Sequence, residues 1–148
     1  MLWYNGGMKI KAIYKPDMST ASQQPYFEAK VPAGFPSPAA DYEENQLDLN
    51  KHLIKNPAAT FFVRVTGDSM TGAGIHDGDL LIVDRSLDPK DKNVVIAAVD
   101  GELTVKRIRI RKKKIYLEPE NENYSTQEIN ENADFQVWGI VTNVIHSL

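Results

Sequence analysis

The feature that most constrains the fold is a pair of apolar runs joined by Asp100-Gly101. Residues 93–99 are rich in Val, Ile and Ala, and residues 102–110 return with apolar and cationic residues in alternation. Asp-Gly favours a two-residue hairpin turn, because both turn positions need a positive φ that these residues tolerate. The sequence therefore predicts a β-hairpin over residues 93–110.

Further apolar runs bounded by turn signals predict more strands and no alternation of strands with helices. A single short helix is predicted from apolar positions 49, 53 and 54, and Asn56-Pro57 ends it. We expect a mainly β domain of twisted antiparallel sheets, with a polar loop over 121–132. The further strands are predicted at 60–66, 80–83, 114–118 and 135–145, the last bent at Gly139.

The N-terminal third has a different character, because prolines interrupt it repeatedly. Proline removes a backbone donor and biases the preceding residue toward extended backbone. We expect residues 1–46 to form an extended arm outside the core, with 8–14 able to add as an edge strand. Residues 47–148 are expected to form the β-rich domain. The prolines of the arm are Pro16, Pro25, Pro32, Pro36 and Pro38.

Composition excludes several kinds of chemistry. The net charge is −3, and the chain has no cysteine, so there are no disulfides, thiolate nucleophiles or cysteine-ligated zinc. No apolar run is long enough for a membrane helix, and we expect a cytoplasmic protein without membrane contact. His52, His76 and His146 do not fall in a metal-ligand spacing, and no nucleotide-binding glycine motif occurs, so no metal or cofactor is expected.

Ser69 lies where the strand predicted at 60–66 gives way to a turn rich in small residues, 71–74. A serine in that position is fixed by a rigid element yet accessible to substrate, as nucleophilic serines are. Turn positions also favour serine for conformational reasons. Taken alone, the position fits an ordinary turn residue as well as a nucleophile.

Lys106 shares a face of its strand with Thr104 and Ile108, beside apolar residues. A lysine acts as a base only when neutral, and from a pKa near ~10.4 neutrality at pH 7 to 7.5 needs a shift of about 3 units. Burial supplies shifts of that size. Lys106 could then take the proton of the Ser69 hydroxyl, with the backbone N–H groups of Ser69 and Met70 as oxyanion donors. A lysine at the mouth of a basic hairpin is the alternative.

Several ordered segments resemble the LexA/UmuD family of self-cleaving serine peptidases. They are Ala33-Gly34, then Gly67-Asp68-Ser69-Met70 with 74–84, and then 98–107. Residues 35–42 resemble UmuD in particular, whereas Ala33 before the glycine is common in LexA-like repressors. The similarity runs from about Gly34 to the C-terminus.

The resemblance implies the fold of the LexA C-terminal domain, with Ser69 as nucleophile, Lys106 as base and Ala33–Gly34 as the chain's own scissile bond. It also implies a homodimer that cleaves itself when bound to an activated RecA–single-stranded DNA filament. The trimmed form would then serve a UmuC-type polymerase as accessory subunit in error-prone translesion synthesis during the SOS response. Sequence-specific DNA binding is not expected, because residues 1–33 show no helix-turn-helix pattern.

Other functions stay open at this point. One is a Ser-Lys peptidase that acts on other proteins, as membrane-anchored signal peptidases do. Another is a fragment of a LexA-like repressor, and a third is a non-catalytic β-rich binding module. The cationic run 106–114 holds seven Lys or Arg in nine residues, and fits either a solvated hairpin or a docking patch for DNA or an acidic partner.

Overall fold

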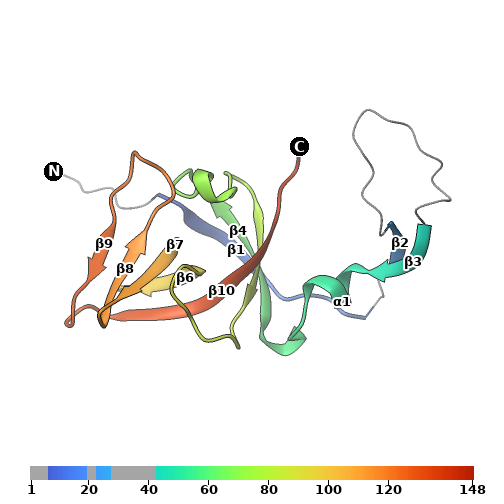
Figure 1. Ribbon diagram of the computed structural model, residues 1–148, viewed down its shortest axis with the longest axis horizontal. Coiled ribbons are helices and arrows are strands. Elements are labelled where there is room, and N and C mark those ends of the chain that lie inside the picture. The colour runs from blue at the N-terminus through green and yellow to red at the C-terminus, as the bar shows by residue number, and fades with distance from the viewer. Residues whose placement is uncertain (1–6, 20–22, 28–42) are drawn as a thin grey trace. The chain divides into compact units, whose positions relative to one another are not determined.

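The computed structural model describes residues 7–19, 23–27 and 43–148 of the chain (Figure 1). The described residues contain ten strands, the short helix α1 (Leu49–Leu53) and the 3-10 turns η2 (Pro57–Ala59) and η3 (Thr71–Ala73). The mainly β fold with one short helix is thereby confirmed. The strands are β1 (Lys9–Tyr14), β2 (Gln23–Phe27), β3 (Glu43–Asp48), β4 (Thr60–Thr66), β5 (Leu80–Asp84), β6 (Val94–Val99), β7 (Glu102–Arg111), β8 (Lys114–Glu118), β9 (Gln127–Ile129) and β10 (Phe135–Ile145).

The chain divides into two compact units, residues 17–57 and a main unit of residues 1–16 with 58–148. The smaller unit holds the antiparallel pair β2–β3 and helix α1, whose N-terminus is capped by the Asp48 side chain accepting from the Asn50 N–H at 3.0 Å. The predicted scissile residues Ala33 and Gly34 lie outside the described residues. The boundary expected at residue 46 stays a prediction.

The main unit is one antiparallel sheet that closes on itself. Its eight strands follow the order β1-β4-β5-β10-β6-β7-β8-β9, and a further pairing joins β1 to β7 at Lys9 and Thr104. The closed ring is therefore β1-β4-β5-β10-β6-β7, with β8 and β9 continuing beyond β7. Figure 1 shows the N-terminal β1, in blue, beside β4, in green. The strand expected at residues 8–14 is confirmed as β1, but it is not a free edge at Lys9, because its pairing with β7 there closes the ring.

Two two-residue turns, the predicted Asp100-Gly101 and Lys112-Lys113, have the backbone that a tight hairpin needs. Asp100 and Gly101 have φ of 49° and 84°, and Lys112 and Lys113 have φ of 49° and 65°. Two successive positive φ values match the right-handed twist of the flanking strands. Lysine has no side-chain reason to adopt this conformation, so the β7–β8 turn is held by the ladder on either side.

The β7–β8 turn gives a stability prediction. We expect Lys113→Gly to raise the free energy of unfolding by about 0.5–1 kcal/mol, because glycine removes the Cβ clash of the left-handed conformation. Chemical denaturation of both proteins measures the change. Lys113→Ala removes the same charge but keeps a Cβ, so an equal gain in both variants would contradict the conformational explanation.

The core consists of two apolar clusters, and one of them includes Met8, which is fully buried. The expectation that residues 1–46 stay outside the core is therefore wrong at Met8. The first cluster is Met8, Val63, Val65, Met70, Ile75, Leu81, Val83, Ile96 and Val105, and the second is Val95, Ala97, Ile108, Leu117 and Ile140.

Two details of the C-terminal half bear on the sequence predictions. Residues 121–132 contain the short strand β9, which pairs with β8, so the loop predicted there is only partly correct. β9 holds a single apolar residue, Ile129, and its sequence carried no strand pattern. In β10 the register shifts between Val137 and Gly139, where a bend was predicted. A Cβ at Gly139 would lie 2.6 Å from Val83 Cγ1, so the close approach of β5 requires glycine.

Candidate active site

Ser69 lies just beyond the end of β4 and is fully buried. The turn around it is fixed by the loop that follows β8. The Ser69 carbonyl accepts from the Glu120 N–H at 2.8 Å, and the Asp68 carbonyl accepts from Asn121 Nδ2 at 2.7 Å. The Tyr124 hydroxyl lies 2.5 Å from Asp68 Oδ1. The serine is thus held by contacts that sequence reasoning did not identify.

The Lys106 side chain extends from β7 toward Ser69. Its Nζ lies 3.4 Å from Ser69 Oγ, although the two residues are 37 positions apart in the chain. Only 7% of the Lys106 surface is exposed. The two side chains that the sequence singled out as nucleophile and base are therefore brought together, whereas Ala33 and Gly34 lie outside the described residues.

The surroundings of Lys106 favour its neutral form. Burial lowers the pKa of the ammonium group from 10.5 to about 8. Nζ also lies 2.9 Å from Thr104 Oγ1 and 3.3 Å from the Val105 carbonyl oxygen. A pKa of about 8 leaves roughly a quarter of the lysine neutral at pH 7.5, so its basic form is accessible near neutrality.

The N-terminal segment Gly7–Met8 covers the pair. The Met8 N–H donates to Ser69 Oγ at 2.8 Å, and the Thr104 hydroxyl donates to the Met8 carbonyl at 3.3 Å. Met8 itself is fully buried. Neither Gly7 nor Met8 was singled out from the sequence, because the contact with Ser69 spans 61 positions and no local pattern marks it.

The hydrogen bonds define what the pair can do chemically. When Lys106 is neutral, its lone pair can accept the Ser69 hydroxyl proton, and the oxygen can then attack a carbonyl carbon. The protonated lysine afterwards holds the proton that a leaving amine needs. Histidine and metal ions have no part in this scheme.

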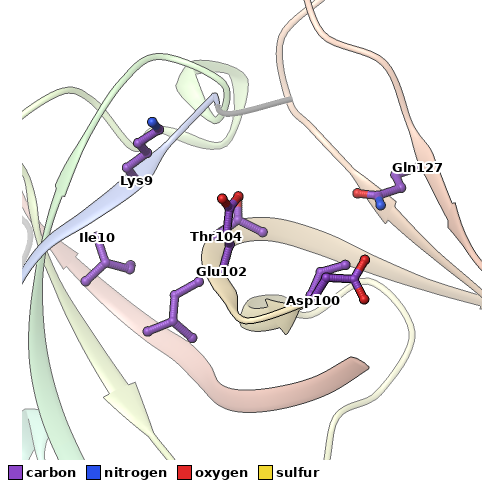
Figure 2. Close-up of a pocket in the computed structure, with 8 residues that line it drawn as sticks. Lys9, Ile10, Asp100, Glu102, Thr104 and Gln127 are labelled. Carbon is purple, nitrogen blue, oxygen red and sulfur yellow. The ribbon is translucent and has the colours of Figure 1, made fainter. Parts of the chain in front are cut away.

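A pocket of about 630 Å³ opens beside the covered pair, where β1 meets β7. Figure 2 shows Lys9 on β1 on one side and Gln127 on β9 on the other, with the β6–β7 hairpin residues Asp100, Glu102 and Thr104 between them. Thr104 lines the pocket and also contacts Lys106 Nζ. The pocket therefore shares Thr104 with the surroundings of the lysine, but neither Lys106 nor Ser69 lines it.

A cluster of potential metal ligands lies apart from this site, at His76, Asp79 and His146. Its ligand atoms lie within 4.8 Å of one another, and His146 Nδ1 lies 2.5 Å from Asp79 Oδ1. Two ligands of one tetrahedral ion with bonds of about 2.0–2.2 Å lie roughly 3.3 Å apart. A separation of 2.5 Å is that of a hydrogen bond, so we interpret the cluster as an anchor for the residue that follows β10.

Three of the seven cationic residues in the run 106–114 lie beside acidic groups. Arg107 Nε lies 2.5 Å from Glu120 Oε1, and Lys114 Nζ lies 3.8 Å from Glu128. Arg109 contacts both Asp91 and Glu118, at 3.2 and 3.6 Å. The pairs of Arg107 and Arg109 join β7 to neighbouring segments and fit the structural interpretation of the run, whereas Arg111, Lys112 and Lys113 are exposed.

Comparison with known proteins places the chain among peptidase-like relatives. The family model described as Peptidase S24-like matches residues 25–142. Protein SamA of Salmonella typhimurium is 51% identical over 132 residues, which cover 89% of each chain. Protein MucA of Escherichia coli is 39% identical over 142 residues, covering 95% of this chain and 94% of MucA. The LexA repressor of Xylella fastidiosa is 33% identical over 140 residues, covering 90% of this chain and 66% of the repressor.

Fold and comparisons together define a β-rich domain of the serine peptidase class. The chain belongs to the Peptidase S24-like family, and within it is a UmuD-like member of the LexA/UmuD group. The resemblance inferred from the sequence is confirmed. Among the described residues, no helix has the length and apolar character to cross a lipid bilayer.

Proposed function

We propose that this chain is a self-processing protein of SOS mutagenesis whose Ser69–Lys106 dyad cleaves its own Ala33–Gly34 bond. The observation that carries the proposal is the buried Lys106 Nζ at 3.4 Å from Ser69 Oγ, with its pKa lowered to about 8. Membership in the Peptidase S24-like family supports it independently.

The proposed reaction uses the lysine twice. Neutral Lys106 takes the Ser69 proton while Oγ attacks the Ala33 carbonyl carbon, and the backbone N–H groups of Ser69 and Met70 stabilise the oxyanion. The C–N bond then breaks, the Gly34 nitrogen takes the proton from Lys106, and residues 34–148 gain a free amino terminus. Water, activated by the lysine, hydrolyses the ester between Ala33 and Ser69.

The proposed partners follow from the family. A RecA–single-stranded DNA filament would activate the cut by favouring the state in which the cleavage-site segment reaches Ser69. The trimmed chain, as a homodimer, would act as accessory subunit of a UmuC-type translesion polymerase. Tethering the substrate to the enzyme raises its effective concentration to the millimolar range for short linkers, so a weak dyad suffices.

Incubation of the purified protein at mildly alkaline pH, with and without RecA–single-stranded DNA, tests the proposal. Mass spectrometry should show fragments 1–33 and 34–148, with faster formation in the presence of the filament. Cutting of added peptides without self-cleavage would instead identify a peptidase for other proteins.

A non-catalytic binding module remains the second candidate, and the complete burial of Ser69 is the observation that favours it. The same incubation separates the two functions. An intact chain and intact added peptides, in every condition and at every pH, would support the binding module.

Thr104 is expected to position the lysine. Its hydroxyl lies 2.9 Å from Nζ, so Thr104→Val should let the amine move and slow self-cleavage roughly tenfold. Thr104→Ser retains the hydroxyl and should restore most of the rate, measured by gel densitometry at matched pH. Equal loss in both variants would point to packing of the threonine methyl group instead.

A further inference from the structure

We infer that the position beside Ser69 and Thr104 that Gly7–Met8 contacts is a peptide subsite that requires glycine, and that Gly7–Met8 occupies it as an uncut internal competitor of the cleavage-site segment. The part of this inference that concerns competition with the cleavage-site segment rests on the proposed self-cleavage. The part that concerns occupation of the subsite by Gly7–Met8 rests only on the contacts that the structure shows around these two residues.

The contacts of Met8 are those of a bound strand. Its N–H donates to Ser69 Oγ at 2.8 Å and its carbonyl accepts from Thr104 Oγ1 at 3.3 Å. Both backbone polar groups of Met8 are therefore hydrogen-bonded to residues of the site. The next residue, Lys9, pairs with Thr104 in the β1–β7 ladder. An extended backbone added to a strand edge is a common mode of peptide recognition. The dyad therefore has an occupant in the described state, and it belongs to the same chain.

Glycine is required at position 7 for two separate reasons. Its φ is +45°, which L side chains rarely adopt, and a Cβ there would lie 2.4 Å from Ser69 Cβ and 2.5 Å from Oγ. The fit is reciprocal, because a Cβ on Gly67 would lie 2.3 Å from the Gly7 carbonyl oxygen. The subsite next to Ser69 thus admits backbone without a side chain. The proposed scissile bond also offers glycine, at Gly34.

The bound pose explains why the Gly7–Met8 bond is not itself a substrate. An N–H that donates to Ser69 Oγ places that oxygen near the plane of the amide, along the N–H direction. Attack on a carbonyl carbon proceeds from above the amide plane. The hydrogen bond also occupies a lone pair of the nucleophile. Gly7–Met8 consequently blocks the serine without presenting its carbonyl for attack.

Release of this segment has a measurable cost. It exposes the Met8 side chain, which is fully buried in the first core cluster, and breaks both backbone hydrogen bonds. Burial of one methionine alone corresponds to a factor of roughly ten to a hundred in an equilibrium constant. Self-cleavage is then limited by the small population in which residues 7 and 8 have left, and a partner that favours that state accelerates the cut.

The chain offers a test of occupancy that does not depend on catalysis. It has no cysteine, so Ser69→Cys introduces a single thiol at the covered position. We expect slow alkylation of that thiol by iodoacetamide in the full chain, and alkylation at least tenfold faster when Gly7→Ala is added or residues 1–8 are deleted. The deletion leaves β1 in place.

Gly78→Ala is the matched control, because Gly78 also has a positive φ, of +85°, but a Cβ there meets no atom within 4 Å. It introduces the same backbone strain away from Ser69 and should leave alkylation unchanged. Thermal unfolding of each variant confirms that the thiol is compared in folded protein. Unchanged alkylation after deletion of residues 1–8 would overturn the occupancy.

The competition with the cleavage-site segment is tested by the self-cleavage rate of the same substitutions with Ser69 retained. Gly7→Ala and the deletion should raise the rate of cutting without the RecA filament at least tenfold, and Gly78→Ala should not. Faster alkylation with an unchanged cleavage rate would overturn the competition. Faster alkylation in a chain that never cleaves itself would refute the proposed function and still support the occupancy.

Discussion

Lys106→Ala is expected to slow self-cleavage at Ala33–Gly34 by roughly a thousandfold, because a positioned general base contributes a factor of about 10² to 10⁴. Ser69→Ala should abolish the reaction, since the nucleophile is lost. Quantitative mass spectrometry of fragments 1–33 and 34–148, at mildly alkaline pH and with the filament present, measures both effects.

Lys106→Arg separates a base from a simple positive charge. Arginine keeps the charge on a slightly longer side chain but stays protonated, so the variant should be as inactive as Lys106→Ala. Lys113→Ala, which removes an exposed lysine of the β7–β8 turn, should cleave at the normal rate. A substantial rate in Lys106→Arg would show that the charge acts without proton transfer and would refute the dyad.

The second large effect is a pH-dependent stability. Burial holds the pKa of Lys106 at about 8 in the folded chain, against 10.5 without burial. The unfolded chain therefore binds more protons than the folded chain between pH 8 and 10.5, and stability rises with pH across that window. Below pH 8 the buried lysine costs about 3 kcal/mol, since each pKa unit corresponds to about 1.4 kcal/mol.

Replacement of the lysine by methionine should remove this dependence. In a Ser69→Ala background that cannot cleave itself, Lys106→Met is expected to raise the free energy of unfolding at pH 7 by up to about 3 kcal/mol. The stabilisation that the hydrogen bonds of Lys106 provided is subtracted from this gain. The advantage should shrink as pH rises from 8 to 10.5. Urea denaturation at pH 7 and pH 9.5 measures the difference in free energy of unfolding between the two variants. An equal difference at both pH values would mean that Lys106 titrates normally in the folded chain.

Much of the fold could be predicted because its signals are local. Apolar runs identified β4 and β10 with their observed bounds, and Asp100-Gly101 identified the β6–β7 hairpin. β9 escaped prediction because its polar residues form a strand only through pairing with β8. Met8 escaped for a similar reason, since its burial depends on strands that begin more than fifty positions later.

For the site, the sequence by itself determined the two groups of chemical interest, Ser69 on its turn and Lys106 among apolar neighbours. Residue type, turn position and strand face are local properties, so they can be predicted from neighbouring residues in the sequence. Tertiary structure alone decided that Nζ and Oγ lie 3.4 Å apart, that Thr104 contacts the amine, and that Gly7–Met8 covers the serine. Apart from the Thr104 contact, which lies within β7, these contacts join residues 37 and 61 positions apart. Such residues come together only when the strands that carry them pack in the closed sheet.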